Sequence, residues 1–291
     1  MIKIIGCNRC SLIGDLICSL PFSYRVKKVY ADSINIAYLD IKCQQLLPLL
    51  VNQDCFDGIR VSELQDEISI NDKNYFKKFN LVFNPFPELT EPDYFNRRSV
   101  IEETFRMNEL DGVGRINPKE WNLLTEEEKK PRLNCWFSIT QNNNCVAIWA
   151  SSGYSTDSVN QKRNPSKQYW AGLVGRLIKE GYKVAQLGTK DHELVHENIL
   201  DLRHLSLFDA IKFTLESTIS IGVDSGSQHI IGAYGHPQII LSAYWRKGHY
   251  TNWSALLPVN CKNRAINIFE SNDINNIQYD KIVEGIKLLN E

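Results

Sequence analysis

A run of small and polar residues, 224–229, follows a strongly apolar segment in the second half of the chain. A turn of this kind between a buried strand and a helix leaves backbone N–H groups unpaired at the positive end of the helix dipole, where phosphate groups bind. Ser225 and Ser227 add hydroxyls, and Gly226 allows a diphosphate to approach the backbone closely. His229, one turn into the helix, can donate to a phosphate or sugar oxygen. The run therefore predicts a phosphate site.

The same run has a plainer interpretation. Every strand–helix connection in an α/β protein needs a tight turn, and Asp224 and Ser225 are both residue types that cap helices. His229 could simply pack in the interior. The pattern alone leaves both interpretations open.

Four short apolar segments in the second half have the length and composition of buried strands. They lie at 145–150, 182–187, 218–223 and 238–243. Helix-like segments separate them, and this alternation predicts a parallel sheet with right-handed crossovers. Open sheets of this type bind ligands at the carboxyl ends of their strands, which is where the turn after 218–223 must lie.

Start and stop signals define the helices between these strands. Asn164-Pro165, a cap residue followed by proline, predicts a helix start, and Gly181 predicts its end. Ser206 and Asp209 resemble a capping box and predict a second start. Further helices are expected at 228–234 and 277–289.

The first half repeats this alternation less clearly. Its predicted elements are a strand at 2–6, a helix at 12–20, a strand at 27–31, and helices at 99–110 and near 118–129. Pro21 is expected to end the first helix. A linker is expected at 131–144, so we predict two domains, 1–140 and 141–291.

The composition argues against several classes of protein. A net charge of −1 over 291 residues does not favour a protein that coats nucleic acid, because such binding depends on neutralising phosphates. The apolar runs are too short to span a bilayer, and the N-terminus lacks a signal-peptide layout. The eight cysteines are therefore expected to be reduced thiols, and the Cys7–Cys10 pair to be incidental rather than a metal or redox site. We expect a soluble cytoplasmic protein.

Three motifs carry a resemblance to a known family. The run 222–229, continuing into Gly235 and Pro237, resembles the D-[ST]-G-x-x-H signature of glycosyltransferase family 9, the ADP-heptose:lipopolysaccharide heptosyltransferases. The segment 162–165, followed by Trp170, is similar to the K-x-W-P segment of that family, with Asn164 in place of the tryptophan. The start of the chain, 12–17, is similar to the L-G-D motif of the family. The resemblance implies an α/β fold of GT-B architecture, in which two Rossmann-like domains with parallel sheets face an interdomain cleft.

The resemblance also implies roles for individual residues. Asp15, the aspartate of the Gly-Asp pair, is the candidate base that activates the acceptor hydroxyl. Lys162, the turn 225–227 and His229 would stabilise the leaving diphosphate, so neither a metal ion nor a cofactor is expected. Donor-binding candidates from the whole chain are Ser151, Ser152, Lys162, Glu193, Asp224, Ser225, Gly226, Ser227 and His229.

Plainer interpretations stand beside these roles. Asp15 could be an acid that only favours the start of a helix, and Lys162 could lie in a solvated loop. Ser151 and Ser152 follow a strand, where serines commonly form turns. Glu193, a candidate acceptor for ribose hydroxyls, lies in a segment whose composition also suits a charged surface loop.

The function implied is inverting, metal-independent transfer of a heptose or related sugar from a nucleotide-diphosphate sugar to a glycan or another hydroxyl acceptor. Two alternatives use the same architecture, since fold does not fix reaction. One is a nucleotide-sugar epimerase or hydrolase, and the other is a binding module that has lost catalysis. The neutral charge argues against a third, a transferase acting on nucleic acid.

Overall fold

The computed structural model describes residues 3–10, 13–29, 31, 33–62, 81–83, 124–135, 143–152, 164–243, 258–270 and 273–291. The chain divides into two compact units. Unit 1 is Met1–Asn134 with Ser254–Leu256, and unit 2 is Cys135–Trp253 with Leu257–Glu291. Among the helices of the described segments, none combines the length and hydrophobicity needed to span a bilayer.

The described strands of unit 2 form a six-stranded sheet in the order β10-β9-β8-β5-β6-β7, with every neighbouring pair parallel. Its strands are β5 (Asn143–Trp149), β6 (Lys183–Leu187), β7 (Leu200–Asp201), β8 (Ser217–Val223), β9 (Gln238–Ala243) and β10 (Ala265–Glu270). The chain runs outward from β5 to β6 and β7, then returns to place β8 on the other side of β5. The strand order therefore reverses between β5 and β8, and sheets of this class bind ligands at such a point.

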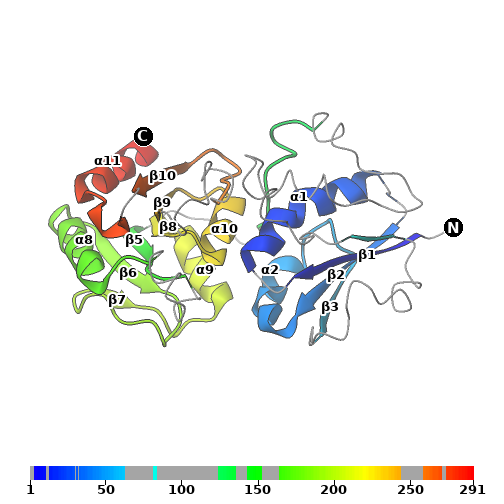
Figure 1. Cartoon of the computed structure of the whole chain (residues 1–291), viewed down its shortest axis with the longest axis horizontal. Helices are drawn as coiled ribbons and strands as arrows, with labels where there is room; N and C mark the ends of the chain where they lie inside the picture. Colours follow the sequence, from blue (N-terminus) through cyan, green and yellow to red (C-terminus); the bar gives the residue numbers. More distant parts are fainter. Residues whose placement is uncertain are drawn as a thin grey trace. The chain divides into compact units, whose positions relative to one another are not determined.

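Helices cover both faces of this sheet (Figure 1). They are α8 (Lys167–Lys179), α9 (Leu207–Glu216), α10 (Gly226–Ala233) and α11 (Tyr279–Asn290), with a short 3₁₀ helix η3 (Ile274–Asn276) before the last. α8 and α11 share one face, where the Tyr279 hydroxyl donates to the Tyr169 carbonyl at 3.1 Å. α9 and α10 pack together on the other face, and Trp149 Nε1 of β5 donates to Thr214 Oγ1 of α9 at 3.2 Å.

The helix signals of the second half are largely confirmed. Ser206 caps α9 and accepts from the Asp209 N–H at 3.1 Å, as a capping box requires. Gly181 ends α8 with a φ of +88°, and the Tyr182 N–H donates to the Leu177 carbonyl at 3.1 Å. The predicted strands match β5, β6, β8 and β9 to within two residues at each end.

The predicted start of α8 is wrong by two residues. Ser166, not Asn164, is the N-cap, because its hydroxyl accepts from the Tyr169 N–H at 3.2 Å. Asn164 instead turns its side chain towards Ser152. Pro165 is buried but lies before the helix rather than in its first turn.

Trp170 is a central residue of the unit 2 core. Its side chain is 1% exposed, and its Nε1 donates to the Ala150 carbonyl at 3.0 Å, just beyond β5. We expect Trp170→Ala to lower the free energy of unfolding by about 3–5 kcal/mol, because it leaves a large cavity. Trp170→Phe keeps most of the volume but leaves the carbonyl unpaired, so we expect about 1–3 kcal/mol. Urea unfolding of the three proteins measures both losses; a Trp170→Phe variant as stable as the wild type would contradict the role of the indole N–H.

The described strands of unit 1 form a parallel four-stranded sheet in the order β3-β2-β1-β4. The strands are β1 (Lys3–Cys10), β2 (Ser33–Asp40), β3 (Gly58–Ser62) and β4 (Leu81–Phe83). α1 (Ile13–Val29) follows β1 and packs against β1 and β2, and η1 (Ile41–Leu46) and α2 (Leu47–Leu50) follow β2 (Figure 1). Both units thus have parallel sheets with helical crossovers, which confirms the α/β fold class.

Two predictions for unit 1 are wrong. Pro21 does not end the first helix, because α1 continues through it to Val29. A proline inside a helix removes one hydrogen bond. Beyond Pro21, long-range contacts hold α1 in place: the Tyr24 hydroxyl donates to Gln53 Oε1 at 3.0 Å, and Lys27 pairs with Asp57 at 2.6 Å. In the strand predicted at 27–31, residues 27–29 belong to the last turn of α1, and the second strand is β2.

The remaining predictions for unit 1 are only partly covered. In the region of the helix predicted near 118–129, residues 126–129 form a turn, and 118–123 lie outside the described residues. The helix predicted at 99–110 also lies outside them. Within the predicted linker, 131–135 has no regular structure, whereas 143–144 already belongs to β5.

Candidate functional site

The carboxyl ends of β6, β5 and β8 lie side by side in unit 2. Trp149 of β5 is in register with Leu187 of β6 on one side and with Gly222 of β8 on the other. The segments that leave these strands therefore start next to one another at one edge of the sheet. They begin at Ala150, Gly188 and Asp224.

The turn after β8 leads directly into α10. Ser225 is the N-cap, with extended backbone angles of φ −157° and ψ 162°, and its side chain makes no capping hydrogen bond. Its hydroxyl lies 3.1 Å from that of Ser227. The first N–H groups of any helix lack intrahelical partners, so Gly226 and Ser227 present donors at the positive end of the α10 dipole. The turn therefore has the geometry of an anion site.

Buried packing fixes where α10 begins. Gln228 is fully buried, and its Nε2 donates to Ser220 Oγ of β8 at 2.9 Å. A Cβ on Gly222 would lie 2.5 Å from that nitrogen and 3.0 Å from Trp149 Cβ. Glycine at 222 thus lets the helix approach β8 closely enough for Gln228 to reach the strand.

His229 lies in the first turn of α10, next to Asp224. Its Nε2 is 3.4 Å from Asp224 Oδ1, and the two side chains are only 11% and 16% exposed. The carboxylate therefore orients the imidazole at the same turn that presents the N–H groups. The structure brings together Asp224, Ser225, Gly226, Ser227 and His229 from the predicted donor-binding set.

The two serines after β5 make contacts that shape the turn. Ser152 is 5% exposed, and both its N–H and its hydroxyl donate to Asn164 Oδ1, at 2.9 and 3.2 Å. The Ser151 hydroxyl donates to the Ser152 carbonyl at 3.1 Å. These contacts favour the plainer interpretation for Ser152, whose hydroxyl fastens the turn to the segment before α8.

Two predicted site residues lie wholly or partly outside the described structure. Lys162 is outside the described residues. Asp15 lies in the first turn of α1, directly after β1, and its side chain is outside the description.

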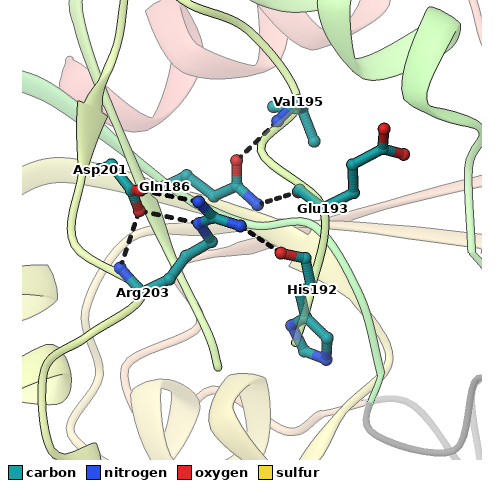
Figure 2. A network of polar contacts seen from close by, with 6 residues as sticks. All are labelled: Gln186, His192, Glu193, Val195, Asp201 and Arg203. Atoms are coloured by element: carbon teal, nitrogen blue, oxygen red, sulfur yellow. Dashed lines mark hydrogen bonds and ion pairs between the residues drawn. The ribbon is translucent and has the colours of Figure 1, made fainter. Parts of the chain in front are cut away.

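The loop after β6, residues 188–195, is held by a network of polar contacts (Figure 2). It turns at Gly188, whose φ is +133°, a backbone conformation that favours glycine. Gln186 is fully buried in β6, and its side chain binds the backbone of the loop at two points. Its Nε2 donates to the Glu193 carbonyl at 2.8 Å, and its Oε1 accepts from the Val195 N–H at 2.9 Å.

Arg203, two residues after the end of β7, holds the same loop. Its guanidinium donates to both carboxylate oxygens of Asp201, at 2.8 and 2.7 Å, and to the His192 carbonyl (Figure 2). The hydrogen bond from Arg203 lowers the pKa of Asp201 to about 2. Burial lowers the pKa of His192. The loop is thus a fixed shape at the sheet edge.

Glu193, the predicted ribose acceptor, points away from this network (Figure 2). Its carboxylate accepts from Lys167 Nζ at 2.5 Å, and the glutamate side chain is 67% exposed. The pair supports the plainer interpretation of a charged surface loop. The backbone of the loop, rather than this side chain, is its ordered part.

We expect Gln186→Leu to loosen the 188–195 loop. The variant removes both side-chain hydrogen bonds and leaves the Val195 N–H and the Glu193 carbonyl without those partners, at a cost of about 2–4 kcal/mol in unfolding free energy. Hydrogen exchange at the Val195 amide should accelerate more than exchange at Leu215 in α9, which serves as the internal control. Equal acceleration at both amides would indicate a global effect and contradict this role.

Comparison with known proteins bears on the fold. No protein-family model matches the sequence, and no curated protein matches it significantly. Solved structures do match over nearly the whole chain. The structure of Escherichia coli ADP-heptose lipopolysaccharide heptosyltransferase II is 14% identical, with 99% of this chain and 98% of that chain covered and a TM-score of 0.69.

Two further structures agree with it. A glycosyl transferase family 9 protein from Veillonella parvula is 15% identical, with 99% and 97% of the chains covered and a TM-score of 0.70. E. coli heptosyltransferase WaaC, solved with ADP, is 12% identical, with 99% and 100% covered and a TM-score of 0.60. This chain has the heptosyltransferase fold. The predicted GT-B architecture is confirmed.

Within the heptosyltransferase fold, sequence reasoning missed the residues that hold the loops. Gln186, Asp201 and Arg203 were not singled out, although a glutamine inside an apolar strand and an arginine two residues after an aspartate are signals of buried polar contacts. Asn164 was interpreted as a helix cap and as a departure from the K-x-W-P pattern. The hydrogen bonds from Ser152 to its side chain give the asparagine at this position a structural role.

Proposed function

We propose that this protein is an inverting, metal-independent glycosyltransferase that moves a heptose or related sugar from a nucleotide-diphosphate sugar to a hydroxyl of a glycan or other acceptor. The observation that carries the proposal is the turn Asp224–Ser227 at the start of α10. It lies beside the point where the strand order of a parallel sheet reverses. The motif resemblance and the heptosyltransferase fold support the same reaction class.

The donor diphosphate would lie against the start of α10. The N–H groups of Gly226 and Ser227 would donate to its oxygens, with the hydroxyls of Ser225 and Ser227 beside them. His229, oriented by Asp224, would donate to a phosphate or sugar oxygen. Fixed donors of this kind stabilise negative charge that grows as the diphosphate leaves, and so lower the barrier. Lys162 would add a positive charge.

The acceptor hydroxyl must lose a proton as it attacks the anomeric carbon. We assign this general-base role to Asp15, the aspartate of the Gly-Asp pair in the first turn of α1. Attack from the face opposite the leaving diphosphate inverts the anomeric configuration. The proton passes to the Asp15 carboxylate, and the nucleoside diphosphate leaves with the bonding electrons.

The test is calorimetry with a panel of nucleoside diphosphates and nucleotide sugars, followed by transfer assays in excess EDTA. We expect the nucleotides that carry one particular nucleobase to bind with dissociation constants in the micromolar range. Ser225→Tyr should abolish that binding, and sugar transfer should persist without free metal. Binding that Ser225→Tyr leaves unchanged would reject the donor site. Conversion of the donor without any acceptor would favour the epimerase or hydrolase alternative.

A further inference from the structure

Unit 1 contains a pocket of about 330 Å³ that has no part in the site described above. Pro21, Tyr24, Arg25 and Lys28 line it from the C-terminal half of α1, and their spacing of three and four residues places them along one helix face. Asp54 and the segment 124–134 supply the other lining residues.

Hydrogen bonds between distant segments fix the shape of this pocket. Gln53 is 2% exposed, and its Oε1 accepts from the Asn134 N–H at 2.8 Å and from the Tyr24 hydroxyl at 3.0 Å. Thr125 and Glu128 form a reciprocal capping box, with the Thr125 N–H donating to the Glu128 carboxylate at 3.0 Å and the Glu128 N–H donating to the Thr125 hydroxyl at 3.1 Å. The pocket walls are therefore preformed.

Most charges around the pocket are paired. Lys28 donates to Glu128 at 2.5 Å, and this bond contributes most to lowering the pKa of Glu128 to about 2. Arg132 pairs with Glu127. Asp54 accepts from the side-chain amide of Asn134 at 3.2 Å.

Arg25 also lines this pocket, on the face that α1 presents to it. Within the described part of the chain its guanidinium forms no ion pair, and its Nε is buried without a hydrogen-bond partner. The Nε of Arg132 is likewise buried and unbonded. The pocket thus combines a positive charge that forms no ion pair with two N–H donors that have no acceptor. A buried donor without an acceptor is unfavourable, and a bound anion would relieve it.

We propose that this pocket binds a small oxyanion, the phosphate or carboxylate group of a metabolite, with Arg25 as its anchor and Arg132 Nε as a second donor. The planar guanidinium fork matches both kinds of anion. The volume is at the lower end of ligand pockets, roughly 300–1,000 Å³, and suits a phosphorylated sugar or a dicarboxylic acid. Arg25 comes ten residues after Asp15 on the same helix, or about 15 Å along its axis, so this site is distinct from the proposed base.

The test uses calorimetry on the full chain with inorganic phosphate, ribose 5-phosphate and succinate, which separates the phosphate and carboxylate sources. We expect at least one probe to bind and Arg25→Gln to weaken it about tenfold or more. Asp54→Asn should tighten binding by about two- to fivefold, because it removes a like charge from the pocket. Arg60→Gln, the same change at an exposed position on β3 of unit 1, is the matched control and should leave affinity unchanged.

All titrations are repeated in the Ser225→Tyr background, because the α10 turn is also proposed to bind phosphate. Binding lost there but kept in Arg25→Gln would place the anion at α10 and overturn the pocket proposal. So would failure of all three probes to bind, or equal weakening by Arg60→Gln. If Arg25→Gln does not fold, as judged by its thermal melt, Asp54→Asn serves as the test. An affinity of Asp54→Asn equal to that of the wild type would then be enough to overturn the proposal.

Discussion

Asp15→Asn is expected to lower the rate of sugar transfer by about 10²–10⁴-fold while leaving donor affinity unchanged. The amide keeps the size of the side chain but cannot accept the acceptor proton. The proposed donor contacts all come from unit 2, so calorimetry with the nucleotide sugar should give the same affinity for Asp15→Asn and for the wild type. Single-turnover assays at saturating donor measure the loss directly.

The control for this experiment is Asp280→Asn. Asp280 is an exposed aspartate in the first turn of α11, paired with Arg176 at 3.1 Å. Because it lies outside the proposed site, the same chemical change there should leave transfer intact. An Asp15→Asn enzyme with wild-type turnover would reject Asp15 as the base without affecting the donor site.

Gly226→Pro is expected to weaken nucleoside diphosphate binding by about tenfold to a hundredfold, the value of one charge-assisted hydrogen bond. Gly226 is the first residue of α10, where proline is tolerated because that N–H has no intrahelical partner. Ser225 already has the extended backbone that a residue before proline adopts. The substitution therefore removes one N–H donor and keeps the helix.

Two variants separate loss of the N–H from other effects. Gly226→Ala keeps the donor and adds only a methyl group, so it should bind far better than Gly226→Pro. Leu207→Pro makes the same backbone change at the first position of α9, after the extended Ser206, and should bind normally. If Gly226→Ala and Gly226→Pro lose affinity equally, space rather than the N–H group explains the loss.

Much of unit 2 could be predicted from the sequence because its signals are local. The capping box of Ser206, the positive φ at Gly181 and the apolar runs of β5, β8 and β9 each depend on a few neighbouring residues. Once the strands alternate with helices, the parallel topology follows. The position of the turn 224–227 at the carboxyl edge of the sheet could therefore be predicted as well.

The wrong or missing predictions share one cause: they depend on contacts between residues that are distant in the sequence. Whether Pro21 ends α1 depends on long-range contacts made beyond it, such as those of Tyr24 with Gln53 and of Lys27 with Asp57, which neighbouring residues do not reveal. The start of α8 depends on whether Asn164 caps the helix or bonds to Ser152, twelve residues away. Gln186 and Arg203 act through contacts with a loop whose path the sequence pattern does not specify.

The central claim is that the start of α10 holds the donor diphosphate, and a crystal of the protein with a bound nucleoside diphosphate tests it most directly. The account predicts phosphate oxygens within hydrogen-bond distance of the N–H groups of Gly226 and Ser227, with the His229 imidazole beside them. A diphosphate bound elsewhere on the chain, with these N–H groups facing only protein or water, would contradict it.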